Sequence, residues 1–287
     1  MTSPLLLGVV AALCWGSADF AARFSGRILG PVQALFCVML AGVMALGLLQ
    51  VFRGEPLFVG LPSWWAVGNG VAGLIGLALL YEGLRRGRVA TVAPLAGAFP
   101  AWALIAMVAF QGVRPSAVAW AAMVATMVGV AVVARFSPAD QEGDGGGRDS
   151  RIAVPAALGS GVMFGLALFF GQYAAAIHGE ASAALMARTV GTVLLFPLFL
   201  ARGPAVPPLR WGVVMAGQGA LDVFGFLALL MAGKGEGGAV AAVVGSTFGL
   251  VTITLARIFL HERMTRWQWH GVALVFGGVA VLTFVQG

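Results

Sequence analysis

The stretch SPADQEGDGGGRDSR, residues 137–151, is the longest polar segment of this 287-residue chain, and the fold can be worked out from it. It holds four acidic residues, two arginines and four glycines, a composition typical of a solvated linker. The residues on either side, 1–136 and 152–287, are overwhelmingly apolar and nearly equal in length. We therefore predict that residues 137–151 join two related halves.

The composition places both halves in a membrane. Hydrophobic residues make up 60% of the chain, charged residues 10%, and the mean hydropathy is +0.96, whereas a soluble domain carries about a quarter charged residues. The bilayer core admits only helices or closed barrels, and the apolar runs lack the alternation of barrel strands. We predict an all-α integral membrane protein with ten transmembrane helices of about 20 residues each. The predicted spans are residues 5–24, 31–52, 63–84, 88–110, 116–135, 152–174, 182–201, 210–232, 238–260 and 266–285.

Each half contains five predicted spans, and the halves share an order of features. A shift of about 150 residues aligns Gly87 with Gly237, and a slightly shorter shift aligns Trp15 with Phe164. Because five is odd, the second half must enter the membrane upside down relative to the first. We therefore predict two inverted five-helix repeats, a plan that recurs in secondary transporters with a binding site near the midplane.

Lysine and arginine are distributed unequally between the loops. Loops on the side of the N-terminus hold Arg53, Arg114 and Lys234, whereas the opposite loops hold thirteen arginines. The positive-inside rule assigns the arginine-rich side to the cytoplasm. We therefore predict a multi-pass protein of the bacterial inner (plasma) membrane with both termini outside.

Short motifs along the chain resemble those of the EamA-type transporters of the drug/metabolite transporter (DMT) superfamily. They are WG at residues 15–16, GRVA at 87–90 before the fourth span, and HER at 261–263 followed by WQWHG at 267–271. The first half departs from the pattern, because QGVR at 111–114 stands where Glu-Arg is expected. The resemblance implies a ten-helix carrier of amino acids, other metabolites or drugs, often an exporter, with both termini in the cytoplasm.

Two charged residues lie well inside predicted spans of the second half, Arg188 and Asp222. An ionisable group in a membrane is costly and marks a functional site by default. A guanidinium suits a substrate carboxylate, and a buried carboxyl group can take an ammonium group or a proton. The alternative is a structural ion pair. The corresponding first-half residues, Val38 and Ala72, are neutral, so we expect a site that the halves line unequally.

Asp19 stands four residues before Arg23, so both lie on one face of the first span near its arginine-rich end. Asp19 is a candidate for binding the substrate or a coupling ion. A local pair with Arg23 at the membrane interface is the alternative.

Proline and glycine mark two spans as candidates for broken, gating helices. Pro94 and Pro100 interrupt the fourth span, and Gly245 and Gly249 loosen the ninth at matching places. Kinks and close packing are the alternative. Two further glycines are predicted to serve packing alone, Gly42 and Gly191.

Aromatic and amide side chains deep in the spans are candidates for the lining of a substrate site. Aromatic faces can hold a cation, whereas core packing is the alternative. These candidates are Trp15, Trp102, Phe164, Tyr173 and Gln218.

The sequence lacks a nucleophile–base motif, metal-ligand spacing and a phosphate-binding GxxxxGK[ST] motif. We therefore predict no enzyme activity, no metal and no cofactor, and basic residues scattered among loops do not predict nucleic-acid binding.

The expected partners are a small-molecule substrate, the lipid bilayer and a proton or solute counter-gradient. We predict a secondary active transporter, an exporter of small metabolites such as amino acids or amphipathic compounds, working by alternating access around a cavity lined by spans 1, 3, 4, 6, 7, 8 and 9. A channel or a non-transporting structural membrane protein is the alternative.

Overall fold

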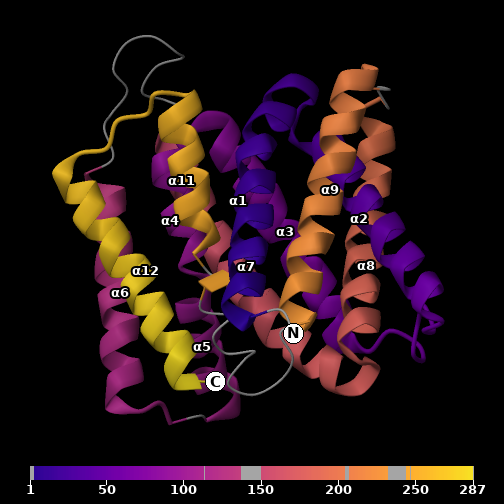
Figure 1. The fold of residues 1–287 in the computed structure, drawn as a ribbon, viewed down its shortest axis with the longest axis horizontal. Helices are drawn as coiled ribbons and strands as arrows, with labels where there is room; N and C mark the ends of the chain where they lie inside the picture. The colour runs from indigo at the N-terminus through magenta and orange to yellow at the C-terminus, as the bar shows by residue number, and fades with distance from the viewer. Residues whose placement is uncertain are drawn as a thin grey trace.

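The computed structural model describes residues 3–112, 114–136, 150–203, 207–231, 244–245 and 247–286. Regular structure within these ranges is entirely helical, and Figure 1 shows the helices packed side by side along one general direction. The helices are α1 (Pro4–Leu29), α2 (Pro31–Arg53), α3 (Trp64–Arg86), α4 (Val89–Gly97), α5 (Phe99–Gln111), α6 (Ala117–Arg135), α7 (Ser150–His178), α8 (Glu180–Ala201), α9 (Leu209–Met231), α11 (Phe248–Phe259) and α12 (Arg266–Gln286).

Eight helical segments within the described ranges are long and apolar enough to cross a membrane. They are α1, α2, α3, the pair α4–α5, α6, α7, α8 and α9. Helix α11 has only 12 residues, and α12, with 21, is not among the eight. The membrane class is confirmed, but the predicted count of ten spans is not. Residues 238–243 and 246 of the predicted span 238–260 lie outside the described residues, and the predicted tenth span, α12, is not among the eight.

The predicted fourth span is broken into two helices. Helix α4 ends at Gly97, Ala98 adopts φ −74° and ψ 5°, and α5 begins at Phe99 with Pro100 in its first turn. Proline is well tolerated there because the first N–H groups of a helix have no partner within the helix. Pro94 lies inside α4 and is buried. The chain therefore breaks between the two prolines.

Two pairs of glycines with positive φ recur about 150 residues apart. Gly30 (φ 80°) joins α1 to α2, and Gly179 (φ 78°) joins α7 to α8. Gly54 (φ 67°) follows α2, and Gly203 (φ 75°) follows α8. Side chains rarely adopt this conformation, so glycine is required at each turn.

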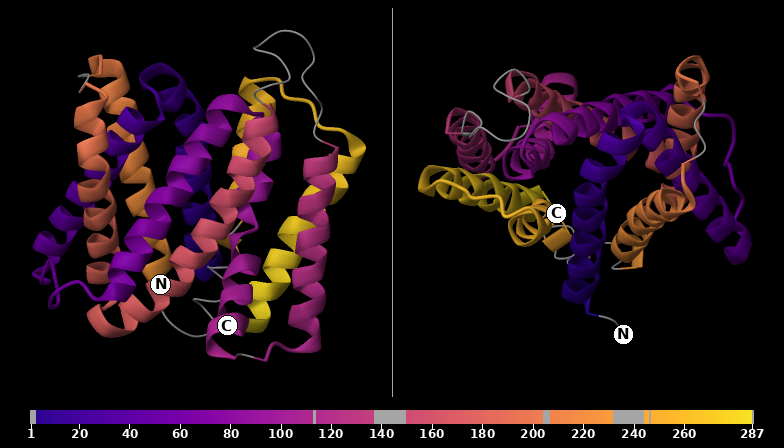
Figure 2. Two further views of the ribbon diagram at one scale, coloured as in Figure 1. Left: turned by 180° about the vertical axis from the view of Figure 1, so that it is seen from behind. Right: turned by 90° about the horizontal axis from the view of Figure 1, so that it is seen from above.

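Helices from the two halves of the chain are interleaved. Helix α3 packs against α7 and α8, α6 against α12, and α1 against α9 and α11. Figure 2 shows α6 and α12 side by side in both views. The core of the molecule is therefore built jointly by residues before and after the linker.

Glycines allow these cross-half contacts to be close. A side chain at Gly70 would meet the Ala187 carbonyl oxygen at 2.6 Å, and one at Gly129 would meet the Gly271 carbonyl oxygen at 2.6 Å. Small residues at such crossings are typical of membrane helices, where van der Waals contact drives association.

The bundle has two ends of different charge. The turn between α3 and α4 and the segment between α11 and α12 lie at one end, which we call the Arg-rich end; the start of α1 and the end of α12 lie at the other (Figure 1). Arginines at the Arg-rich end include Arg23, Arg27, Arg85, Arg86, Arg88 and Arg263.

Enlarging Gly129 tests the pairing of α6 with α12. We expect Gly129→Leu to lower stability by about 1–3 kcal/mol, because backbone atoms of α12 cannot retreat from the new side chain. Thermal unfolding of the detergent-solubilised protein measures the effect. Gly277→Leu is the control, because a side chain at Gly277 of α12 meets nothing within 4 Å. Equal melting temperatures for the two variants would contradict this packing.

Candidate functional site

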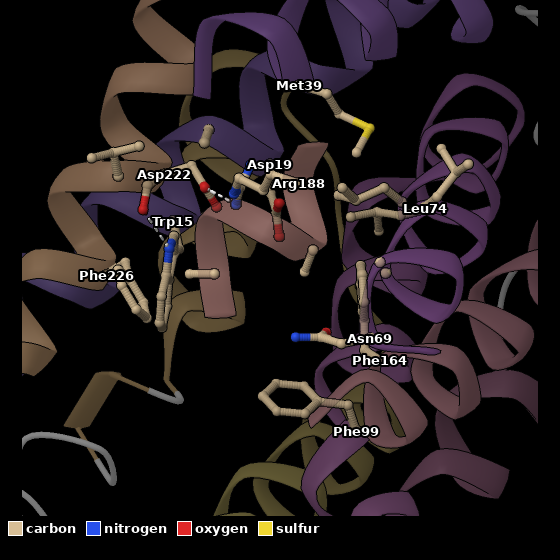
Figure 3. A pocket seen from close by; sticks show the side chains of 18 of the residues that line it. Trp15, Asp19, Met39, Asn69, Leu74, Phe99, Phe164, Arg188, Asp222 and Phe226 are labelled. Carbon is tan, nitrogen blue, oxygen red and sulfur yellow. Dashed lines mark hydrogen bonds and ion pairs between the residues drawn. The ribbon is translucent and has the colours of Figure 1, made fainter. Parts of the chain in front are cut away.

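A cavity of about 350 Å³ lies among the helices of both halves. Figure 3 shows charged side chains on one side of it and Leu74, Phe99 and Phe164 on the other. Helices α1, α2, α3, α4, α5, α7, α8, α9 and α11 each contribute to its lining.

An ion pair between the predicted residues Arg188 and Asp222 lies in the cavity wall. Arg188 comes from α8 and Asp222 from α9, and Nη2 of the arginine donates to Oδ2 of the aspartate. The side chains are 23% and 28% exposed, so the pair is shielded by protein but open to the cavity. This exposure leaves both groups accessible to a bound solute.

Neighbouring helices fix the position of this pair. The indole Nε1 of Trp15 on α1 donates to the backbone carbonyl of Asp222 at 3.2 Å. A side chain at Gly42 on α2 would lie 3.0 Å from the Arg188 Nη1 atom, so the glycine leaves room for the guanidinium. Gly42, predicted to serve packing alone, thus supports the site, whereas Gly191 packs against Met39 as predicted.

Asp19 also lines the cavity, from α1. Figure 3 places its carboxylate beside Arg188 and Asp222. The lining therefore contains two carboxyl groups and one guanidinium. One arginine cannot neutralise two carboxylates, so the site suits a further positive charge, either a proton or an ammonium group.

Aromatic rings form much of the remaining wall. Trp15 meets Phe248 of α11 edge to face, with ring centroids 6.1 Å apart, and Phe99, Phe164 and Phe226 complete the aromatic surface. Asn69 on α3 adds a neutral amide to the lining. The cavity thus combines apolar walls with a few polar groups, as small-molecule sites usually do.

Three predicted lining residues lie outside the cavity wall. Tyr173 stacks on Trp65 with centroids 4.0 Å apart, and Trp102 packs where Gly165 allows α5 and α7 to approach closely. Gln218 is 3% exposed and donates to the Tyr81 hydroxyl at 3.2 Å and the Ala18 carbonyl at 3.1 Å. These side chains join helices next to the cavity.

The four predicted helix-break residues also lie behind the lining. Pro94 and Gly245 are buried. Pro100 is the second residue of α5 and directly follows the lining residue Phe99. A side chain at Gly249 would meet the Phe276 ring at 2.6 Å, so this glycine serves the packing of α11 on α12. The break between α4 and α5 borders the cavity, but these residues do not line it.

Sequence reasoning missed several lining residues. Helix α2 was not expected to contribute, yet Met39 and Leu46 line the cavity. Phe226 stands four residues after Asp222, a spacing that puts both on one face of α9 and was available in the sequence. Leu and Met on α2 carry no comparable signal, because apolar residues also face lipid.

Within the described ranges, no group of three or more His, Cys, Asp or Glu side chains is placed to hold a metal ion.

Apolar helices around a charged cavity of ligand size define a multi-pass membrane protein with an internal cavity. The model of the EamA-like transporter family matches residues 2–135 and again residues 151–284. The chain therefore belongs to the EamA-like transporter family, within the DMT superfamily.

Solved structures contain the same fold. One crystal structure, described only as "Crystal structure of protein", superposes with a TM-score of 0.65 at 17% sequence identity, covering 97% of this chain and 95% of the other. No curated protein matches the sequence.

Removing each member of the Arg188–Asp222 pair tests its electrostatics. We expect Arg188→Met to destabilise the protein more than Asp222→Asn, because the first leaves two carboxylates without their arginine and the second leaves Asp19 beside Arg188. Costs of about 1–3 kcal/mol are expected, below those of a fully buried pair because the cavity is partly solvated. Thermal unfolding of the two single variants and the double variant gives the interaction free energy between Arg188 and Asp222. Strictly additive effects would show that the two residues do not interact.

Proposed function

We propose that this protein is a secondary active transporter that exports small amphipathic metabolites, such as amino acids, by alternating access. The observation that carries the proposal is the charged cavity enclosed by helices of both halves. Membership of a transporter family supports transport rather than catalysis as the activity.

The chemistry of the cavity supports a zwitterionic or amine-bearing substrate. Arg188 suits a carboxylate, because a guanidinium can donate two parallel hydrogen bonds to it. Asp19 and Asp222 suit an ammonium group, and the aromatic walls suit an apolar side chain. A volume of about 350 Å³ lies at the lower end of small-molecule sites and therefore favours a small metabolite.

Binding such a substrate would exchange partners within the site. The substrate carboxylate would take a place on Arg188, and the ammonium group would take a place on Asp222 or Asp19. The Arg188–Asp222 ion pair would be replaced by ionic contacts with the substrate, so loading would exchange one set of contacts for another. This exchange lowers the cost of desolvating the solute.

Alternating access is supported by two features of the fold. Both halves line the cavity, and the glycine turns recur in the halves, with Gly30 at the Arg-rich end and Gly179 at the other. These features support the inverted repeats that we propose, and inverted repeats let one half rock against the other around a central site. A proton or solute counter-gradient would supply the energy.

Counterflow in proteoliposomes loaded with apolar amino acids would test the transport proposal. The expected result is saturable uptake of labelled solute. Gly73→Leu should reduce it to background, because Gly73 lines the cavity and a side chain there meets nothing within 4 Å, so leucine fills the site without displacing a helix.

Gly217→Leu is the matched control for this substitution. Gly217 on α9 also has nothing within 4 Å of an added side chain but does not line the cavity, so transport should be kept. Linear, non-saturating flux would favour a channel. Equal transport by both variants would remove the cavity from the mechanism.

We further propose that the protein lies in the bacterial inner membrane with its Arg-rich end in the cytoplasm. The excess of loop arginines at that end supports this orientation. Reporter fusions at Gly287 should report a location outside the cytoplasm. Activity of a cytoplasmic reporter at this position would reverse the assignment.

A further inference from the structure

Glu262 joins the two halves of the chain at the Arg-rich end. It lies in the segment between α11 and α12, and its carboxylate accepts hydrogen bonds from the backbone N–H groups of Val89 at 3.2 Å and Ala90 at 2.9 Å. These are the first two residues of α4. A carboxylate from the second half thus caps a helix of the first.

Arg23 of α1 completes this contact. Its Nη1 atom lies 3.4 Å from Oε1 of Glu262 and donates to the Gly87 carbonyl at 2.7 Å. The Arg23 and Glu262 side chains are only 11% and 7% exposed. We call the contact of Arg23, Glu262 and the start of α4 the α4 latch.

The energetics of the latch depend on the carboxylate. Arg88, the N-cap residue of α4, provides no side-chain cap, so the helix relies on Glu262 for its first N–H groups. A negative charge at a helix N-terminus is stabilised by the N–H groups and the helix dipole. Removing one member of a buried pair leaves the other charge uncompensated.

The latch lies between the cavity and the Arg-rich end. On α1, Asp19 lines the cavity and Arg23 lies one helical turn beyond it. On α3, Leu80 lines the cavity, and the residues beyond it, Tyr81 and Leu84, are only 3% and 0% exposed. A solute in the cavity is therefore separated from that end by buried side chains and by the latch itself.

The residues that correspond to Arg23 and Glu262 at the opposite end carry no charge. By the shifts that align the halves, Arg23 corresponds to Gln172, and Glu262 corresponds to Gly112. Both counterparts are exposed and uncharged. Cross-half contacts there include a hydrogen bond between Nδ1 of His178 and the Val59 carbonyl at 2.7 Å.

This second end is also more open. A hollow of about 740 Å³ lies there, and its lining includes Gln50, His178, Ser182 and the charged residues Arg53, Glu55 and Glu180. The two ends thus differ in packing, and the Arg23–Glu262 pair has no charged counterpart at the positions related to it by the repeat.

We propose that the α4 latch holds the Arg-rich end closed, so that the resting protein favours opening at the other end, where the hollow lies. The inference rests on the proposed function, because it assumes that the two ends open alternately. Each transport cycle must then separate Glu262 from α4 and Arg23. The latch sets the population of the state that opens at the Arg-rich end.

The test measures access to Leu84 without any substrate. Leu84→Cys is placed in a background with Cys14→Ser and Cys37→Ser, and maleimide labelling is followed in lipid nanodiscs, where both ends face buffer. Glu262→Gln should raise the labelling rate of residue 84 about tenfold, because the closed state loses a buried ionic contact. An unchanged rate would overturn the proposal.

Two controls separate opening of the latch from other effects. Glu82 lies at the same end, but its carboxylate pairs with Arg85 at 2.9 Å and with Arg86, both on its own helix α3. Glu82→Gln therefore breaks no contact between helices and should leave the labelling rate of residue 84 unchanged. Met186→Cys, at a site 1% exposed on α8, reports general loosening. Equal increases at residues 84 and 186 would show that Glu262 maintains the fold instead, which overturns the latch.

A second variant keeps the test decisive if Glu262→Gln fails to give a monodisperse protein. Arg23→Gln removes the other member of the pair and should likewise raise labelling at residue 84; no increase overturns the proposal. Because labelling needs no solute, it is independent of counterflow. Failure of counterflow with a normal labelling response would remove the transport proposal alone.

Discussion

A charge in the hydrocarbon core of a membrane must find its counter-charge within the protein, and this constraint shapes the centre of the molecule. Arg188 and Asp222 meet across α8 and α9 and face a cavity instead of lipid. Trp15 and Gly42 then have roles that follow from the pair, since one holds the Asp222 backbone and the other leaves room for the guanidinium. Asp19 adds a second carboxyl group to a site with one arginine. This charge balance is the basis of our proposal that the cavity binds a solute with charges of its own.

Close packing between the halves makes such a cavity possible. In lipid, helices gain little from burying apolar surface, so they associate through van der Waals contact at small residues. Gly70 and Gly129 bring helices of opposite halves together, and the paired turns at Gly30 and Gly179 give each half the same hairpin. Gly73, by contrast, faces open space in the cavity. The same residue type thus closes the bundle in some places and leaves it hollow in another.

The two halves carry different charged residues. Arg188 and Asp222 belong to the second half, whereas Asp19 and Arg23 belong to the first. Glu262 reaches from the second half to Arg23 and the start of α4 in the first. A symmetric scaffold would favour neither end, whereas the contact that we propose as a latch would stabilise closure at the Arg-rich end. Direction-dependent behaviour can therefore arise from a few side chains on a duplicated fold.

The sequence by itself determined the membrane class, the family and most spans, because hydropathy and helix length are local properties. It also predicted Trp15, Asp19, Phe164, Arg188 and Asp222 as site residues, and all five line the cavity. They could be predicted because charges and large aromatic rings stand out among apolar residues. Only the tertiary structure placed Tyr173, Trp102 and Gln218 behind the lining, brought Met39 and Leu46 into it, and joined Glu262 to Arg23 and α4. An apolar face can meet lipid, another helix or a cavity with the same residues. Which of these it meets is decided by helix rotation and by contacts between residues far apart in the chain.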